Sequence, residues 1–141
     1  MTDPQIALLS AALRHTRDAE ALLSSSPDQA WHLAGFGPEC ARKAALSERW
    51  ADKAVGHQLG ALAQGVLETA IAMDAHAARY RLDGWVSRWP ALAQWSPESR
   101  YRKTGSTPKA SAEALTAAAR EAVGGLVAEL WADGALTTPE I

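Results

Sequence analysis

Apolar residues recur along most of this chain at the three- and four-residue spacing of a single helix face. This spacing predicts four long helices, over residues 3–23, 27–50, 57–82 and 108–132. A shorter, tryptophan-rich helix is expected around residues 84–95, and residues 96–107 are expected to form a loop. Because the connections are brief, consecutive helices should run antiparallel. The pattern therefore predicts an all-α antiparallel bundle of four long helices plus one short helix.

Residues that favour helix starts stand before three of the predicted helices. Asp3, Ser26 and Thr107 each precede a proline, and a proline suits the first turn of a helix, where its missing N–H has no helical partner to lose. Asp133 and Gly134 form a typical helix end. We therefore expect one helical domain over residues 1–134 and a short C-terminal tail over residues 135–141.

The composition agrees with a helical protein. The chain has 31 Ala and 16 Leu against eight Val and Ile combined, a balance that favours helix over sheet. A single cysteine, Cys40, excludes an internal disulfide and a cysteine-rich zinc site, and suits a reducing compartment. No apolar run approaches the ~20 residues of a membrane span, and the N-terminus lacks a signal-peptide pattern. We therefore expect a cytoplasmic protein that does not associate with membranes.

The net charge of −2 conceals a strongly basic stretch. Residues 79–109, called the basic segment below, hold seven Lys and Arg residues and two acids, whereas the rest of the chain holds seven basic and fourteen acidic residues. The basic segment also contains five of the nine aromatic residues. Arginine interleaved with flat rings suits phosphates and stacked bases. The alternative interpretation is structural: these rings fill the core between helices, and the arginine side chains extend over that core.

Metal and cofactor motifs are not evident. The histidines do not form an HExxH zinc pattern, and the chain has no GxxxxGK[ST] phosphate loop. His32 and Glu39 are seven residues apart on one helix face, but two ligands do not make a metal site. Cys40 lies on the apolar side of its helix and is expected in the core. We therefore expect neither a metal nor a cofactor.

Glycines and tryptophans inside the predicted helices point to close contacts. Close packing of neighbouring helices is the expected reason for four of the glycines, Gly35, Gly37, Gly124 and Gly125. Six tryptophans are more than one bundle of this size readily encloses. We therefore expect a homodimer that buries some of them, with Trp85, Trp89 and Trp131 as the candidates.

Three motifs occur in order along the chain. Residues 31–44 read WHLAGFGPECARKA, residues 56–59 read GHQL and residues 95–102 read WSPESRYR. They resemble the second-helix pattern of HEPN domains (aromatic-x-L-A-G-Y-x-x-E-C-x-x-K-A), the G-H-x-L opening of the third helix, and the W-x-P-x-x-R-Y-R segment before the last helix. Two residues depart from the family pattern: Pro38, where a small helix former is usual, and Phe36, which lacks the tyrosine hydroxyl.

This resemblance implies a helical bundle, a homodimer, and either RNA cleavage or nucleotide binding, often beside a partner from a neighbouring gene such as a nucleotidyltransferase. Ribonucleases of the family use an R-x4-6-H motif, in which histidine moves a proton and arginine steadies the developing phosphorane charge. Here seven residues separate Arg49 from His57, and no histidine follows His76, so the motif is absent. That absence favours binding over ribonuclease chemistry of the usual HEPN kind.

Three functions remain open at this stage. The first is a non-catalytic HEPN-like domain that binds a nucleotide, RNA or a protein partner, in a toxin–antitoxin or defence-type system. The second is a divergent HEPN enzyme, with ribonuclease or unrelated chemistry on the same fold. The third is a structural, antitoxin-like protein that acts through a helical face.

The candidate ligand-binding residues come from the motif regions and are Glu39, Lys43, His57, Trp95, Arg100, Tyr101, Arg102 and Lys103. Arg100 is expected to matter most, because a guanidinium offers phosphate a bidentate fork that lysine cannot supply. Trp95 and Tyr101 are expected to stack on a base. The alternative makes Arg100 a buried ion-pair partner of Glu39, in which case its loss would reduce stability rather than affinity.

Overall fold

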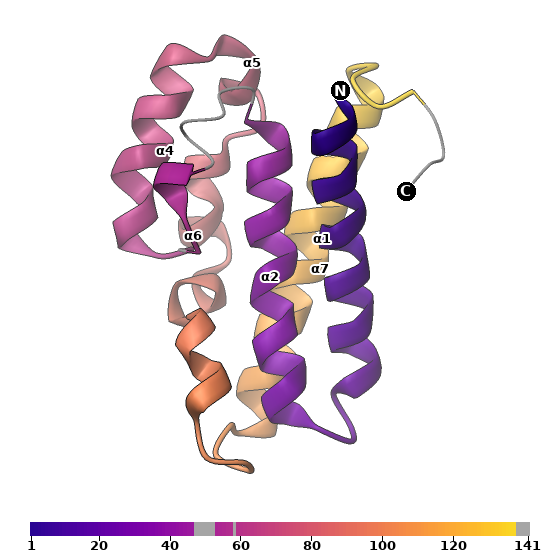
Figure 1. The fold of residues 1–141 in the computed structure, drawn as a ribbon, viewed down its shortest axis with the longest axis vertical. Helices are drawn as coiled ribbons and strands as arrows, with labels where there is room; N and C mark the ends of the chain where they lie inside the picture. Colours follow the sequence, from indigo (N-terminus) through magenta and orange to yellow (C-terminus); the bar gives the residue numbers. More distant parts are fainter. Residues whose placement is uncertain (47–52, 58, 138–141) are drawn as a thin grey trace.

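Three long helices form the centre of the molecule in the computed structural model, which describes residues 1–46, 53–57 and 59–137. They are α1 (Asp3–Leu22), α2 (Pro27–Ala45) and α7 (Lys109–Ala132), and each packs against the other two. The described residues contain no strand, so the predicted all-α class is confirmed. In Figure 1, α1 and α2 run in opposite directions, whereas α7 runs in the same direction as α2, because the chain between them returns along the bundle.

The chain between α2 and α7 forms a second group of shorter helices. They are α4 (Ala61–Met73), α5 (Ala75–Ala78), α6 (Trp85–Arg88) and the 3-10 helices η1 (Leu82–Gly84), η2 (Pro90–Gln94) and η3 (Pro97–Tyr101). In Figure 1, α4 stands beside α2 on the side away from α1. η2 packs on α7 and η3 packs on α2, so the basic segment lies against two of the long helices.

The helix predicted over residues 57–82 is shorter in the structure than the sequence pattern indicates. α4 ends at Met73, because the backbone of Asp74 is extended, with φ −127° and ψ 95°. The Asp74 carboxylate then accepts hydrogen bonds from the N–H groups of His76 and Ala77, at 3.0 and 3.3 Å. An aspartate in this position caps a new helix, here α5. The structure thus has three long helices and a 13-residue α4 among its described residues, instead of four long ones.

The tryptophan-rich segment is also broken. Trp89 precedes Pro90, and the residue before a proline is driven out of helical geometry by contact with the proline ring. The predicted helix over residues 84–95 therefore forms α6 and η2, with Trp89 between them. The predicted loop over residues 96–107 contains η3. Helix α2 ends at Ala45, and the remainder of its predicted range falls largely outside the described residues.

Two glycines of α2 allow close packing, as predicted. A Cβ atom on Gly35 would overlap the ring of Trp95, and a Cβ atom on Gly37 would overlap the hydroxyl of Thr16. The glycines therefore let η2 and α1 approach the α2 backbone. This contact explains how Trp95, which follows η2 directly, becomes 4% exposed.

The core is built mainly from leucine and alanine of the long helices, together with Trp31, Trp85 and Trp95. Trp85 is 5% exposed within its own chain, so its predicted place in a dimer interface is wrong, whereas Trp131 is 44% exposed. Leu136 is buried, and the Met1 amino group donates to the carbonyl of Ala135 at 3.0 Å. The packed domain thus includes the first residues of the predicted tail.

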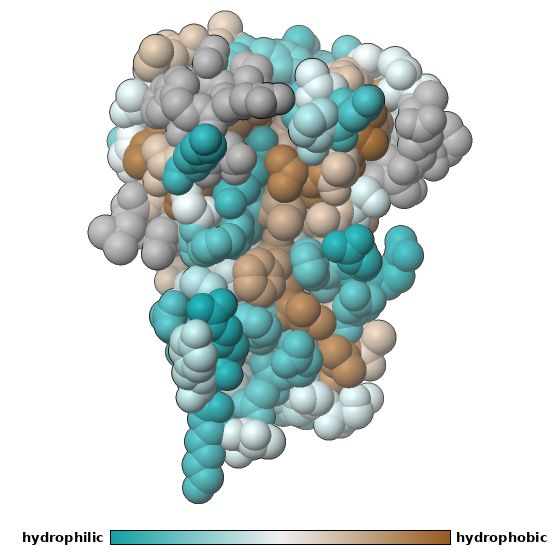
Figure 2. Space-filling view, viewed as in Figure 1, coloured by the Kyte–Doolittle hydropathy of each residue, from teal (hydrophilic) through white to brown (hydrophobic). Residues whose placement is uncertain are grey.

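Much of the surface is hydrophilic on the face that Figure 2 presents, and a band of apolar residues crosses it over α1 and α2. Partly buried apolar side chains of these two helices pack against the core cluster, among them Leu13, Leu33 and Phe36. No helix among the described residues is long and apolar enough to cross a membrane.

Candidate functional site

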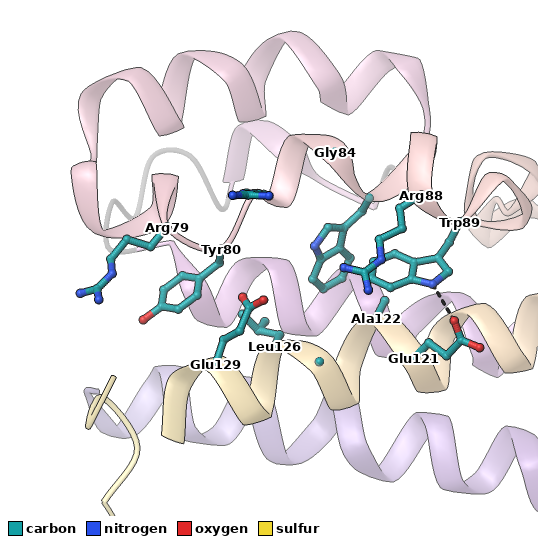
Figure 3. A pocket seen from close by; sticks show the side chains of 12 residues that line it. Arg79, Tyr80, Gly84, Arg88, Trp89, Glu121, Ala122, Leu126 and Glu129 are labelled. Atoms are coloured by element: carbon teal, nitrogen blue, oxygen red, sulfur yellow. Dashed lines mark hydrogen bonds between the residues drawn. The ribbon is translucent and has the colours of Figure 1, made fainter. Parts of the chain in front are cut away.

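A cavity of about 580 Å³ lies between the first part of the basic segment and helix α7. We call it the arginine cavity, because Arg79, Arg81 and Arg88 line it. Figure 3 shows Arg79, Tyr80 and Glu129 at one end, and Arg88, Trp89 and Glu121 at the other. The basic half of the lining comes from a segment of short helices, and α7 supplies the acidic and small residues. The cavity thus brings together residues that lie about 40 positions apart, from Arg81 to Glu121.

The three arginines of the cavity have different surroundings. Arg79 donates to the carboxylate of Asp133 at 2.7 Å, which neutralises its charge. Arg88 lies over the ring of Trp89, with its guanidinium carbon 4.6 Å from the ring centroid. Arg81 is exposed, and its side chain makes no ion pair or hydrogen bond with any residue that the structure describes. Arg81, unlike Arg79, therefore keeps its charge available for an anion.

The backbone of Arg81 is strained. Its φ is +46° and its ψ is 44°, the left-handed conformation, and no other non-glycine residue among the described ones has a positive φ. This conformation costs an L-amino acid about 1–2 kcal/mol, because Cβ crowds the backbone carbonyl oxygen. Glycine or asparagine is the usual residue at such a point. An arginine held there at the edge of a cavity is a feature typical of functional sites.

Aromatic residues form one wall of the cavity. Trp85 and Trp89 meet edge to face, with ring centroids 5.8 Å apart, and the indole N–H of Trp89 donates to Glu121 at 2.9 Å. Figure 3 shows the indole of Trp89 above α7. These contacts hold the two rings in place.

A fully buried arginine supports this wall from behind. The guanidinium of Arg42 lies 5.3 Å from the centroid of Trp85 and donates to the carbonyl of Leu59 at 3.1 Å. Burial lowers the pKa of Arg42 to about 10, and the nearby charge of Asp83 partly offsets this. Arg42 remains protonated at neutral pH, so a positive charge stands behind the indole of Trp85.

Helix α7 forms the floor of the cavity, with Glu121, Gly125 and Glu129 at intervals of four residues on one face. Gly125 and its neighbour Gly124 are both exposed, and a Cβ atom on either would meet nothing within 4 Å. The prediction that this glycine pair serves close helix packing is therefore wrong for the described part of the chain.

Three of the predicted site residues meet elsewhere, at a buried carboxylate. Glu39 is 3% exposed, and its Oε1 atom accepts from Lys43 Nζ at 2.9 Å and pairs with His57 Nδ1 at 2.8 Å. Arg100 is exposed and does not join them. The predicted alternative of a buried pair between Arg100 and Glu39 is thus wrong, because Lys43 on α2 and His57 reach the carboxylate instead.

Three histidine rings surround Phe36 beside this carboxylate. The ring centroids of His15, His32 and His57 lie 5.6, 5.1 and 6.4 Å from that of Phe36. His32 Nδ1 lies 2.9 Å from Ser99 Oγ. Burial is the main cause that lowers the pKa values of His15 and His32, followed by the positive charges of Arg14 and Arg100 respectively. Sequence reasoning missed His15 in this cluster, because only the packing of α1 on α2 brings it there.

The remaining predicted residues lie on or next to η3. Arg100 lies over the ring of Tyr101 at 4.8 Å, and Arg102 lies over the ring of Trp31 at 4.6 Å. Tyr101 is 73% exposed, and Lys103 is also exposed. Trp95 is buried and donates its indole N–H to the carbonyl of His32 at 3.0 Å, so it has no free face for a base. Its predicted stacking role is therefore wrong.

The structure divides the basic segment between two places. Its first part forms the arginine cavity with α7, and its last part forms the η3 surface beside α2. The sequence motifs point to the η3 residues individually, whereas Arg79, Arg81 and Arg88 stand out in the sequence only as part of the basic segment. The Glu-x3-Gly-x3-Glu spacing on α7 is the signal that would have identified the cavity floor.

No group of three or more His, Cys, Asp or Glu side chains within the described ranges is arranged to hold a metal ion. Comparisons with protein-family models, with curated proteins and with solved structures find no match for this chain. The resemblance to HEPN domains therefore rests on the sequence motifs alone.

Proposed function

We propose that this protein binds a nucleotide in the arginine cavity, with Arg81 as the main ligand of the phosphates. The observation that carries this proposal is an exposed arginine without an ion-pair partner among the described residues, held in a strained backbone conformation at the edge of the cavity. A strained residue persists only where its surroundings hold it, and such strain gathers at sites of ligand binding.

The chemistry of the lining suits both parts of a nucleotide. Arginine offers a planar fork to phosphate, and the partly exposed indole of Trp89 together with the guanidinium of Arg88 that stacks on it offers a flat surface to a base. The volume of about 580 Å³ lies within the range of roughly 300–1,000 Å³ that small-molecule sites occupy. Because Arg79 pairs with Asp133, Arg81 and Arg88 supply the positive charge of the lining, and Glu121 and Glu129 supply the negative charge. The resemblance to HEPN domains implies nucleotide binding as well.

Isothermal titration calorimetry with ADP, inorganic pyrophosphate and adenosine tests the proposal. ADP should bind most tightly, because it uses both the arginines and the aromatic wall. Replacing Arg81 by Gln should weaken ADP binding about tenfold or more, as expected for the loss of a charged hydrogen-bond donor. Arg17→Gln is the matched control, because Arg17 is an exposed arginine of α1 that does not line the cavity.

Two results would contradict this function. ADP that fails to bind the wild-type protein at millimolar concentration would refute it directly. Equal weakening by Arg81→Gln and Arg17→Gln would show an effect of net charge alone.

Higher salt should weaken ADP binding, because it screens an exposed cation such as Arg81.

A second candidate function is the binding of single-stranded RNA at η3. It is favoured by Tyr101, which is 73% exposed and flanked by Arg100 and Arg102. An exposed ring beside cations suits stacking of a base, which contributes ~1–3 kcal/mol per base. Tyr101→Ala should then weaken the binding of a short oligoribonucleotide, measured by fluorescence anisotropy, and leave ADP binding unchanged. An oligoribonucleotide that binds the variant and the wild type equally would exclude this surface.

A further inference from the structure

Two adjacent glycines stand on the exposed side of helix α7, well inside its ends. Glycine is among the weakest helix formers, because it loses the most backbone freedom on folding. A Cβ atom on Gly124 or Gly125 would meet nothing within 4 Å, so no packing contact within the described chain requires a glycine at either position. The two positions differ in one respect: Gly125 lines the arginine cavity and Gly124 does not.

The residues one turn to either side of Gly125 are both acidic. Glu121, Gly125 and Glu129 all line the cavity, so a strip of bare helix backbone lies between two carboxylates. Glu121 accepts the indole N–H of Trp89 at 2.9 Å. The carboxylate of Glu129 makes no hydrogen bond or ion pair with any described residue, and Figure 3 shows it beside Tyr80 and Leu126. Glu129 thus keeps its capacity to accept hydrogen bonds from a ligand.

A nucleotide has one part that matches this strip. Its phosphates are repelled by carboxylates and attracted by Arg81, whereas the two ribose hydroxyls are neighbouring hydrogen-bond donors that suit a carboxylate. A sugar is also thicker than a base, and it requires room where it lies against a helix. Gly125 leaves that room, because no side chain covers the backbone there.

We propose that α7 carries the ribose subsite of the nucleotide site, in which Gly125 leaves space for the sugar and Glu129 accepts hydrogen bonds from its hydroxyls. The ligand class is then a ribonucleotide rather than a deoxyribonucleotide. This inference rests on the proposed nucleotide binding and adds a prediction about the sugar to it.

The test is calorimetric titration of the full chain with ADP and with 2′-deoxy-ADP. The wild-type protein should prefer ADP by about tenfold, since one hydrogen bond to a charged acceptor is lost with the hydroxyl. Gly125→Ala should weaken ADP binding by a similar factor. Gly124→Ala is the matched control and should leave ADP binding unchanged. Both variants should melt at higher temperature than the wild type, because alanine favours helix over glycine.

Glu129→Ala gives an independent readout that does not depend on folding or on absolute affinity. Glu129 is exposed, so its removal should leave the fold intact. Loss of a negative charge can raise the affinity for any anion, but the ratio between ADP and 2′-deoxy-ADP should fall to about one. That ratio reports the sugar contact alone.

The outcomes separate this inference from the proposed function. If the wild-type protein binds ADP and 2′-deoxy-ADP equally, or if Gly125→Ala and Gly124→Ala behave alike, the ribose subsite is refuted while nucleotide binding stands. A preference for ADP that survives in Glu129→Ala would assign the sugar contact to another residue and would refute the role of Glu129. If neither nucleotide binds the wild type, both proposals fail together.

Discussion

At the scale of single residues, the position of a charge relative to its neighbours decides its role. Arg79, Arg81 and Arg100 belong to the same basic segment, yet Arg79 pairs with Asp133, Arg81 has no ion-pair partner among the described residues, and Arg100 lies over Tyr101. Arg42 is buried, and its pKa falls to about 10. Neighbouring side chains, the local backbone and burial distinguish these arginines, because their side-chain chemistry is the same.

Arg81→Gly should separate stability from binding. Glycine adopts the left-handed conformation without the crowding of Cβ, so we expect the free energy of unfolding to rise by up to about 1 kcal/mol. The same change should weaken ADP binding, because the phosphate ligand is lost. Chemical denaturation and calorimetry measure the two effects. Arg17→Gly, in the middle of α1, is the control and should lower stability by about 1 kcal/mol.

Arg100→Ala should change the pKa of His32 with little effect on stability. The charge of Arg100 is the second cause, after burial, that lowers the pKa of His32, so its removal should raise that pKa. The melting temperature should hardly move, because exposed substitutions of this kind change stability by about 0.5 kcal/mol or less. An NMR titration of the imidazole signals checks the first effect. A large fall in melting temperature would contradict the exposed position of Arg100.

At the scale of elements, glycine has opposite roles in α2 and α7. Gly35 lets the ring of Trp95 approach the α2 backbone, whereas Gly124 and Gly125 have open space where a side chain would stand. Single residues also determine where the helices end. Asp74 ends α4 by capping α5, and Pro90 ends α6 at Trp89. These breaks divide residues 61–101 into pieces short enough to follow the side of the bundle.

Gly35→Ala should destabilise the protein by about 1–3 kcal/mol, the usual cost of overpacking a well-filled core. A Cβ atom at this position would overlap the buried ring of Trp95, which is rigid and hydrogen-bonded to His32. Gly124→Ala should change stability in the other direction. Urea unfolding of both variants measures the difference. If Gly35→Ala were as stable as the wild type, the close contact between α2 and Trp95 would be wrong.

At the scale of the whole molecule, the three-helix centre and the second group of helices meet at two polar clusters. One is the arginine cavity, and the other is the group of histidines around Phe36 with Glu39. Each draws residues from at least two elements that are distant in sequence. The dependence of stability on pH follows from the buried histidines, and the state of association follows from the exposed surface.

Stability should fall as the pH drops below about 6.5. The folded state lowers the pKa values of His15 and His32 below the usual 6.5, mainly by burial. In this range the unfolded chain therefore binds more protons than the folded one, and proton uptake favours unfolding. About one pH unit above 6.5 and higher, both histidines are almost entirely neutral in either state, so their contribution no longer changes. Thermal melts between pH 7.5 and 5.5 should show the loss, and a His15→Gln/His32→Gln variant should show a smaller slope.

The homodimer expected from the sequence stays a prediction, with Trp131 as its main candidate residue. Trp131 is 44% exposed near the end of α7, whereas Trp89 is held by Glu121. Light scattering should give a particle of twice the 15.0 kDa chain mass. Trp131→Asp should return the particle to the single-chain mass, because a charge opposes burial in an interface. A wild-type protein that scatters as a single chain at every concentration would contradict the dimer.

The sequence by itself determined the helical class, because local alanine and leucine content and helix periodicity act within one segment. The starts of α1 and α2 and the end of α7 near Asp133 could be predicted for the same reason. The predicted caps are correct only to within one residue, since Thr2 and not Asp3 is the N-cap of α1, and Pro108 and not Thr107 is that of α7.

The candidate site was predicted only in part. Lys43 lies one turn from Glu39 on α2, so their contact is local, and His57 joins them as a predicted member of the same site.

Only the tertiary structure decided where the basic segment acts. Trp95 is buried because Gly35 gives it room, and the charge of Arg81 belongs to a cavity because α7 lies opposite. The direction of α7, parallel to α2, follows from the path of the intervening short helices. These outcomes depend on contacts between residues far apart in the chain, and helix periodicity carries no information about which face meets which partner.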